Sequence, residues 1–177
     1  MILYYQTLQM VLKPLSIWRH LEKMSKNTIR RVYWDACVWI AYINEESAGE
    51  NRHEKCKTVL QQAKNGEIEI VTSTINLAEV RGKNTSIPNF PEFLESSFIL
   101  LIPVDKWVGR KAHDLQKAGT LSGKPADSIH FATALQTYGI SELHTYDSDL
   151  LKLDNKFPEL KICKPTENDP LDLFTQV

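Results

Sequence analysis

The chain has 177 residues, of which 42% are hydrophobic and 24% charged, so it fits one domain of ordinary size with a buried core and argues against a disordered chain. The 21 Lys and Arg residues are balanced by 22 Asp and Glu residues, for a formal net charge of −1. This balance argues against a non-specific nucleic-acid binder, and any RNA binding must rest on a local basic patch.

The N-terminal residues 1–30 differ from the rest, and we expect an extension or arm there. Residues 23–31 are polar and basic like a linker. The sequence leaves open whether Met24 is the true start or whether residues 5–22 form an amphipathic helix that packs on the domain or a partner. The apolar stretch 2–18 is too interrupted to span a membrane and lacks the features of a secretory signal, so we expect a cytoplasmic protein.

The first half of the remaining chain alternates between strands and helices. A β-rich segment, Val32–Trp34, runs into Asp35, and a second strand is expected at 68–71. Ser73 or Thr74 is expected to cap a helix that carries Glu79 two turns in and ends at Gly82. Between and around these elements we expect helices at 36–46 and 50–65.

The second half continues the alternation. The unbroken apolar run 98–104 predicts a strand buried on both faces. Asp105 is expected to cap the next helix, and Pro125 to open a helix that closes at Gly139. The remaining expectations are a loop at 83–91, short helices at 91–96 and 148–153, a strand at 143–146 ending at Asp147, and a last strand at 160–163. The pattern predicts an α/β fold, a three-layer α/β/α sandwich around a central parallel sheet.

Four acids fall where an α/β sheet places ligands, at the ends of strands and on the helices that follow. They are Asp35, Glu79, Asp127 and Asp147. A single acid in such a place is usually a cap or turn residue, but four are harder to explain in that way. If they converge, their mutual repulsion destabilises the fold unless a hard cation such as Mg²⁺ binds among them.

Four segments resemble the acidic motifs of PIN-domain ribonucleases, and most closely the virulence-associated toxin C branch of toxin–antitoxin systems. The segments are Val32–Ile40, Ser73–Val80, Lys124–Leu135 and Leu143–Leu151. Each motif is short, and the ordered set spans about residues 31–164. We therefore expect a nuclease domain at 31–164, followed by a C-terminal tail at 165–177.

The resemblance implies an endoribonuclease that depends on Mg²⁺ or Mn²⁺ and cuts single-stranded RNA. Asp35, Glu79, Asp127 and Asp147 would form its catalytic metal site, with Thr145 as a supporting hydroxyl. It also implies a homodimer and a small antitoxin protein as partner. The chemistry expected is metal-assisted attack by water, which leaves a 5′-phosphate and a 3′-hydroxyl.

Two features depart from the family pattern. About thirty residues precede the first strand, where the family has only a few. The residue two positions after the first acid is commonly Asn or Ser, and here it is Cys37. The extension can change contacts with partners, and the thiol can alter the support of Asp35.

Other signals carry less weight. His130 follows Asp127 by one helical turn, so it is either a substrate contact or, as favoured, a packed or surface residue. Asp149 is either a fifth acid of the site or, as favoured, a cap or solvated residue. Trp34, Trp39 and Trp107 are expected to pack in the core or a dimer interface rather than stack on bases. The three cysteines form no CxxC pair, which excludes a zinc ribbon.

Three further hypotheses about function are alternatives to a toxin nuclease. One is a non-catalytic PIN-fold module that binds RNA or protein, and another is a housekeeping nuclease that processes RNA. The third is a metal-dependent phosphatase of another α/β class, which the absence of a DxDxT motif after the first strand makes a poor fit.

Overall fold

The structure is a computed structural model that describes residues 29–47, 49–81, 87 and 89–166. Almost all of the expected extension 1–30, with Met24 and the helix at 5–22, lies outside the described residues. The same holds for most of the expected loop at 83–91 and for residues 167–177 of the expected tail.

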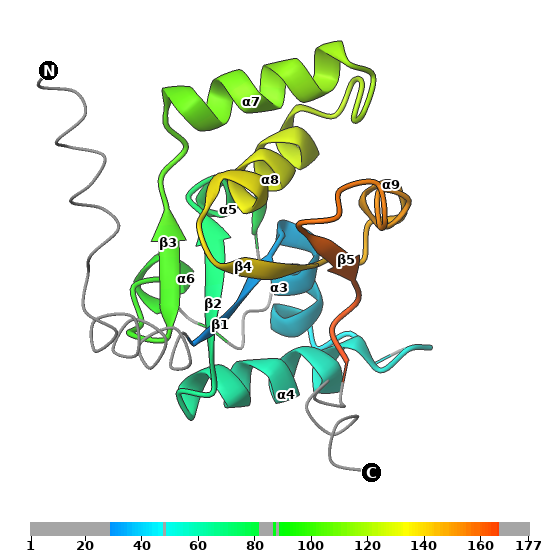
Figure 1. Ribbon diagram of the computed structural model, residues 1–177. Coiled ribbons are helices and arrows are strands. Elements are labelled where there is room, and N and C mark those ends of the chain that lie inside the picture. Colours follow the sequence, from blue (N-terminus) through cyan, green and yellow to red (C-terminus); the bar gives the residue numbers. More distant parts are fainter. Residues whose placement is uncertain (1–28, 48, 82–86, 88, 167–177) are drawn as a thin grey trace, which may run out of the picture.

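A five-stranded sheet forms the centre of the molecule (Figure 1). Its strands are β1 (Arg30–Trp34), β2 (Ile68–Ser73), β3 (Ile99–Ile102), β4 (Ile140–His144) and β5 (Lys161–Cys163). They lie in the order β3-β2-β1-β4-β5, and every neighbouring pair is parallel. The predicted α/β fold with a central parallel sheet is thereby confirmed.

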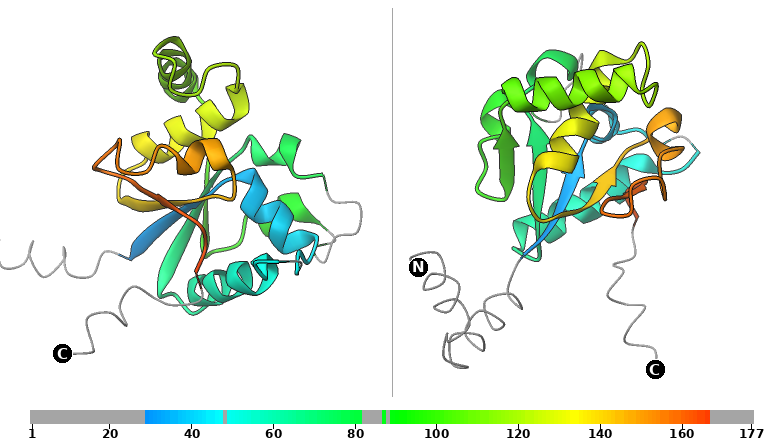
Figure 2. Two further views of the ribbon diagram at one scale, coloured as in Figure 1. Left: turned by 90° about the vertical axis from the view of Figure 1, so that its right-hand side faces the viewer. Right: turned by 45° about the horizontal axis from the view of Figure 1, so that its top comes forward.

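Helices cover both faces of the sheet (Figure 2). One face packs on α3 (Ala36–Ile43), α4 (Arg52–Lys64) and α6 (Phe90–Phe93). The other packs on α7 (Lys106–Lys117), α8 (Pro125–Gln136) and α9 (Ser148–Leu151). Asp105 caps α7 as expected, since its side chain accepts hydrogen bonds from the backbone N–H groups of Trp107 and Val108.

The central strand β1 shows why two cores form. Val32 and Trp34 point into the core beneath α3 and α4, whereas Tyr33 points into the core beneath α7 and α8. All three side chains have no exposed surface. Successive side chains of a strand face opposite sides, so a strand buried between two helical layers is apolar throughout.

The direction in which the chain adds strands to the sheet reverses at β1, which has β2 on one side and β4 on the other. From β1 the chain winds outward through β2 to β3, and then crosses to the other side of β1 to add β4 and β5. In open α/β sheets, ligands bind at the carboxyl ends of the strands where this reversal occurs. The residues that follow β1 and β4 are Asp35 and Thr145, so the fold places both at that position.

Two strand predictions need correction. The segment 98–104 was expected to be buried on both faces, but β3 is an edge strand in which only Ile99 is buried and the next three residues are half-buried. An edge strand lacks a neighbour on one side, and helical cover there is incomplete. The strand expected at 143–146 runs instead from Ile140 to His144, so Asp147 does not end it.

None of the helices in the described part of the chain is long and apolar enough to cross a membrane.

Candidate functional site

Asp35 lies at the junction of β1 and α3, with only 3% of its surface exposed. Its Oδ1 caps α3 by accepting a hydrogen bond from the Val38 N–H (3.1 Å), and the Cys37 thiol donates to the same oxygen (2.9 Å). Burial raises the pKa of Asp35, while His130 and these hydrogen bonds oppose the rise. The fold thus keeps a carboxylate in a place where its negative charge is costly without a nearby cation.

Thr145 links the ends of β1 and β4. Its hydroxyl donates a 2.5 Å hydrogen bond to Asp35 Oδ2 and accepts one from the Asp147 N–H (2.9 Å). The side chain has no exposed surface. One buried hydroxyl therefore fixes the second carboxylate oxygen of Asp35 and the start of the segment that carries Asp147.

Cys37 supports the same junction from the other side. Besides donating to Asp35, its sulfur accepts a hydrogen bond from the Tyr146 N–H (2.9 Å). Burial and the neighbouring Asp35 carboxylate raise the pKa of this thiol, so it stays protonated and acts as a donor. The thiol performs the bridging that an alcohol side chain can perform at this position, and the carboxylate is left intact.

Asp147 caps α9 rather than ending a strand. Its Oδ1 accepts hydrogen bonds from the N–H groups of Asp149 (2.7 Å) and Leu150 (3.0 Å). Its other oxygen, Oδ2, lies 3.6 Å from the ammonium of Lys124. Capping consumes one oxygen and leaves the second directed toward a cation.

Lys124 gathers three acids around one positive charge. Its Nζ lies 3.5 Å from Asp127, 3.6 Å from Asp147 and 2.6 Å from Asp149. Burial and the negative charge of Asp147 raise the pKa of Asp127, whereas the hydrogen bond from Lys124 lowers that of Asp149 to about 2. The Asp149 bond also raises the pKa of Lys124, which remains fully charged.

Glu79 belongs to a buried hydrogen-bond chain. The ring of His130 is 2% exposed, and its Nε2 lies 2.7 Å from Glu79 Oε2. A carboxylate only accepts, so Nε2 donates to Glu79, while Nδ1 shares a 2.8 Å hydrogen bond with the Tyr33 hydroxyl. His130 thus holds the Glu79 side chain from below while about a third of that side chain remains exposed.

The expected position of Glu79 within its helix was wrong. α5 (Asn76–Glu79) has only four residues, and Glu79 is its last residue rather than two turns in. Ile75, not Ser73 or Thr74, precedes the helix, and no side chain caps it. Asn76 is fully buried and its amide donates to Thr72 Oγ1 (2.7 Å), which ties this short turn to the end of β2.

The structure brings the predicted acids into one neighbourhood but not into one tight cage. The charge of Asp147 raises the pKa of Asp127, and the charge of His130 lowers the pKa of both Asp127 and Asp35. His130 also contacts Glu79. Among the described residues, however, no three of the four acids have ligand oxygens within 4.8 Å of one another. The tight convergence assumed from the sequence is therefore not found, and of the four predicted acids only Asp127 and Asp147 share a contact, with the Lys124 ammonium.

The donor set suits a hard divalent cation. Oxygens of three carboxylates lie within 3.6 Å of the Lys124 ammonium, so one cation already binds where these acids meet. Mg²⁺ and Mn²⁺ prefer oxygen ligands and keep several waters, so they do not need a closed protein cage. Asp35 is linked to this group through the Thr145 hydroxyl, which contacts both Asp35 Oδ2 and the Asp147 N–H.

A second group of potential ligands lies elsewhere, between β4 and β5. Ligand atoms of Glu142, His144 and Cys163 lie within 4.8 Å of one another. The Trp34 indole N–H, which can only donate, points at His144 Nδ1 (3.2 Å), so His144 Nε2 carries the proton and donates to Glu142 (3.0 Å). Both ring nitrogens of His144 are thereby engaged in hydrogen bonds, so we interpret this group as a structural hydrogen-bond network.

Three residues near this site were missed or given too little weight in the sequence analysis. Lys124 was not singled out, although its place three residues before Asp127 puts both on one turn. The packing interpretation of His130 captured its burial but not its bond to Glu79. Asp147, and not Asp149, caps α9. The Asp149 carboxylate instead pairs with both Lys124 and Lys152 (each 2.6 Å).

A comparison with protein-family models identifies a known domain in this chain. The PIN domain family model matches residues 32–156. No curated protein matches the chain. One solved structure to which it is similar is the Mycobacterium tuberculosis toxin VapC20, described as cleaving the sarcin-ricin loop, with 17% identity and a TM-score of 0.49 over 67% of this chain and 91% of that one.

Proposed function

Because this chain belongs to the PIN-domain family, we propose that it is an endoribonuclease that hydrolyses RNA with the help of Mg²⁺ or Mn²⁺. The observation that carries the proposal is the meeting of Asp127, Asp147 and Asp149 on one positive charge, next to buried Asp35. Nothing in a purely structural role requires so many acids at the carboxyl ends of the strands.

Asp35, Glu79, Asp127 and Asp147 would hold the divalent ion. Thr145 and Cys37 would keep Asp35 oriented, and His130 would do the same for Glu79. When bound, the ion would lower the pKa of a water molecule and neutralise charge that develops on the phosphate. Hydrolysis adds the oxygen of water to phosphorus and breaks the bond to O3′, leaving a 5′-phosphate and a 3′-hydroxyl.

The charge of Asp35 supports its assignment as a ligand. Its pKa is raised because the carboxylate is buried, and a divalent cation would relieve that cost. Metal binding and the stability of the fold should therefore be coupled. This coupling provides a test that does not depend on knowing the RNA target.

The direct test is cleavage of a labelled single-stranded RNA with Mn²⁺, with Mg²⁺ and with EDTA. We expect metal-dependent cutting that Asp35→Asn and Asp127→Asn each reduce by at least about a hundredfold. Lys57→Gln, an exposed change on α4, is the control that should leave the rate unchanged. Cutting that continues in EDTA, or equal cutting by Asp35→Asn, would refute the proposal.

A non-catalytic module of the same fold is the second candidate. The observation that favours it is Lys124, whose ammonium already neutralises part of the charge of three acids. A single ammonium leaves a net negative charge among Asp127, Asp147 and Asp149, so a divalent ion can still compete. Absence of Mn²⁺ binding by calorimetry, together with absence of cleavage, would favour the non-catalytic module.

We further propose that the nuclease is the toxin of a toxin–antitoxin pair, acting in the cytoplasm as a homodimer that a small antitoxin protein neutralises. The support is the ordered set of acidic motifs in the sequence. Expression of the chain should arrest growth, and Asp127→Asn should relieve the arrest. A small gene next to this one would supply the antitoxin, whereas harmless expression would favour a housekeeping RNA-processing role.

A further inference from the structure

We propose that the outer face of α7 binds the phosphodiester backbone of the RNA strand that the acidic site cuts. This inference rests on the proposed nuclease function. Four basic side chains form one stripe along the helix, at spacings of three and four residues: Lys106, Arg110, His113 and Lys117. All four are exposed, and residues at these spacings share a face of a helix.

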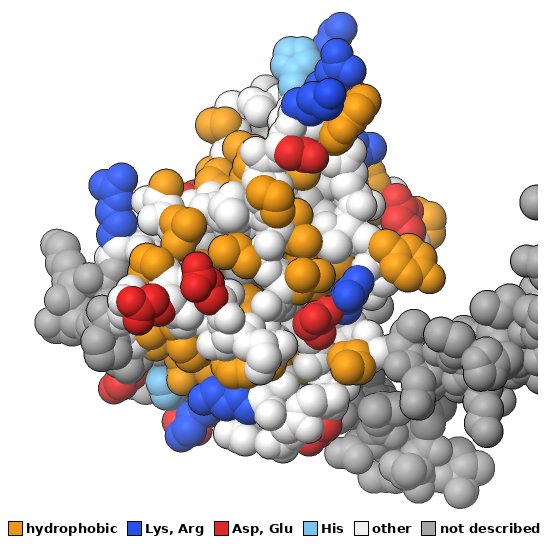
Figure 3. All heavy atoms as spheres, turned by 90° about the vertical axis from the view of Figure 1, so that its left-hand side faces the viewer, with side chains coloured by type: hydrophobic (Ala, Val, Ile, Leu, Met, Phe, Trp, Pro, Cys, Tyr) orange, Lys and Arg blue, Asp and Glu red, His pale blue; other side chains and the backbone are white. Residues whose placement is uncertain are grey.

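The stripe is a concentration of positive charge in a chain with almost none overall. The helix α7 carries four Lys or Arg residues against one Asp, whereas the whole chain has a net charge of −1. Figure 3 shows Lys and Arg side chains gathered with a histidine at the top of the molecule, where α7 lies. This is the local basic patch that RNA binding requires in a chain of balanced charge.

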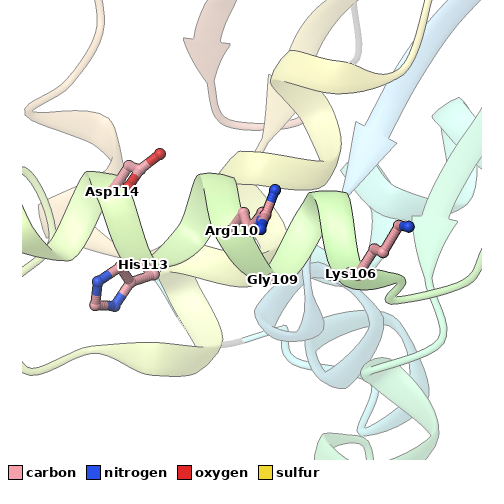
Figure 4. A pocket seen from close by; sticks show the side chains of 5 residues that line it. All are labelled: Lys106, Gly109, Arg110, His113 and Asp114. Atoms are coloured by element: carbon pink, nitrogen blue, oxygen red, sulfur yellow. The ribbon is translucent and has the colours of Figure 1, made fainter.

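The Lys and Arg side chains of the stripe are not neutralised by acids among the described residues. Lys106, Arg110 and Lys117 form no ion pair with any described residue, while the lysines near the acids and on β5 do. The one acid of the helix, Asp114, has no ion pair with a described residue either. Lys106, Arg110, His113 and Asp114 line a shallow hollow, and Figure 4 shows them in succession along the helix.

Trp107 adds a feature that a plain charged helix lacks. Its indole is 55% exposed, so of the two expected environments, the core or a dimer interface, the core is wrong for Trp107, whereas Trp34 and Trp39 are fully buried. Lys106 Nζ and Arg110 Cζ lie 4.9 and 5.6 Å from its ring centre. An exposed aromatic flanked by cations is the arrangement on which unpaired bases stack while phosphates are neutralised beside them.

The position of α7 connects the stripe to the cutting site. The helix packs along α8, which carries Asp127 and His130, and residues 118–123 lead directly from its end to Lys124. The acids of the site repel a phosphate chain, so the strand needs a cationic surface outside the site to hold it. The stripe supplies that surface on the same helical layer.

The test compares two matched double variants in full-length protein. Lys106→Gln with Arg110→Gln removes two charges from α7, and Lys57→Gln with Lys64→Gln removes two from the exposed face of α4, on the opposite side of the sheet. Binding of a fluorescein-labelled single-stranded RNA is measured by anisotropy in EDTA at several salt concentrations. We expect the α7 variant to lose about tenfold in affinity and to lower the salt slope by about 1.4, with little change in the control.

Two further measurements separate this role from others. Trp107→Ala should weaken binding about tenfold and Trp107→Phe much less, because a ring remains available for stacking. In the cleavage assay the α7 double variant should raise KM and leave kcat unchanged, since its residues lie outside the acidic site. Thermal unfolding should stay at the wild-type temperature, because all the changed side chains are exposed.

Several outcomes would overturn the proposal. Equal RNA affinity of the two double variants would do so while leaving the nuclease function intact, provided that cleavage still depends on Asp35. Failure of the wild-type chain to bind RNA in EDTA would do so as well. Loss of a dimer by the α7 variant with unchanged RNA binding would identify the face as a protein interface instead. If RNA binding depends on α7 but the wild-type protein does not cleave RNA under any metal condition, the nuclease function is refuted while the role of the α7 stripe in RNA binding is supported.

Discussion

Replacing Thr145 by Val tests whether Asp35 is held as a buried, ionised carboxylate. The change keeps the shape of the side chain but substitutes a methyl group for the hydroxyl. Asp35 Oδ2 loses its 2.5 Å hydrogen bond, and the Asp147 N–H loses its acceptor. A buried group left without its partner costs about 1–3 kcal/mol, and more when it is charged, so we expect a loss of about 2–4 kcal/mol in the free energy of unfolding at pH 7.

The loss should depend on pH in a defined direction. Burial already raises the pKa of Asp35 in the folded state, and the substitution raises it further. A group of this kind destabilises the fold above its folded pKa, and the penalty disappears below its unfolded pKa, near 4. The difference between Thr145→Val and wild type should therefore shrink as the pH falls toward 4.

The assay is urea unfolding followed by circular dichroism between pH 4 and 8, with Thr137→Val as the control. Thr137 also loses a hydroxyl, but its acceptor, the Thr133 carbonyl, keeps the hydrogen bond from the Thr137 N–H (3.0 Å). The control should cost less than about 1 kcal/mol. Equal losses of unfolding free energy in the two variants, or a loss in Thr145→Val that does not change with pH, would show that the hydroxyl of Thr145 does not stabilise an ionised Asp35.

Three further predictions follow from the same contacts. Lys124→Gln should raise the affinity for Mn²⁺ by roughly three- to tenfold in calorimetry, because the ammonium competes for the carboxylates that would hold the ion; unchanged or weaker binding would contradict that competition. Glu142→Gln should destabilise the chain by about 1–2 kcal/mol at pH 7, because the His144 hydrogen bond lowers the Glu142 pKa to about 2. This contribution to stability is present above about pH 4.5 and is lost as the pH falls toward 2. The unfolding free energies of the variant and the wild type should therefore converge in acid. Cys37→Ser should keep stability within about 1 kcal/mol and retain cleavage, whereas Cys37→Ala should cost more, since only serine can still donate to Asp35; equal unfolding midpoints of the two variants would contradict this role.

The parallel sheet and its order of elements were predictable because hydrophobic runs and breakers report them directly. Asp105 and Pro125 marked helix starts that the structure confirms. The failures concern position within the sheet. The run at 98–104 is as apolar as a central strand, but its place at the edge depends on the order of winding, which local pattern does not contain.

Site residues were harder to predict where they depend on contacts distant in sequence. His130 and Glu79 are 51 residues apart, and only the fold shows that one orients the other. The sequence does not single out Lys124, because a lysine before a helix is ordinary. Its role becomes clear only from its contacts with Asp147 and Asp149 at the start of α9. Trp107 sits among apolar and basic neighbours, so composition alone did not reveal which side faces water.

The reversal of winding between β1 and β4 has a consequence for when the acidic site comes into existence during synthesis. Asp35 and Thr145 are separated by 110 residues, yet they share one hydrogen bond at the centre of the sheet. Until β4 has been made, β1 has an unpaired edge and Asp35 lacks its hydroxyl partner. A shortened chain that stops before β4 (Ile140–His144) contains neither Thr145 nor Asp147, so the segment from β4 onward completes the site.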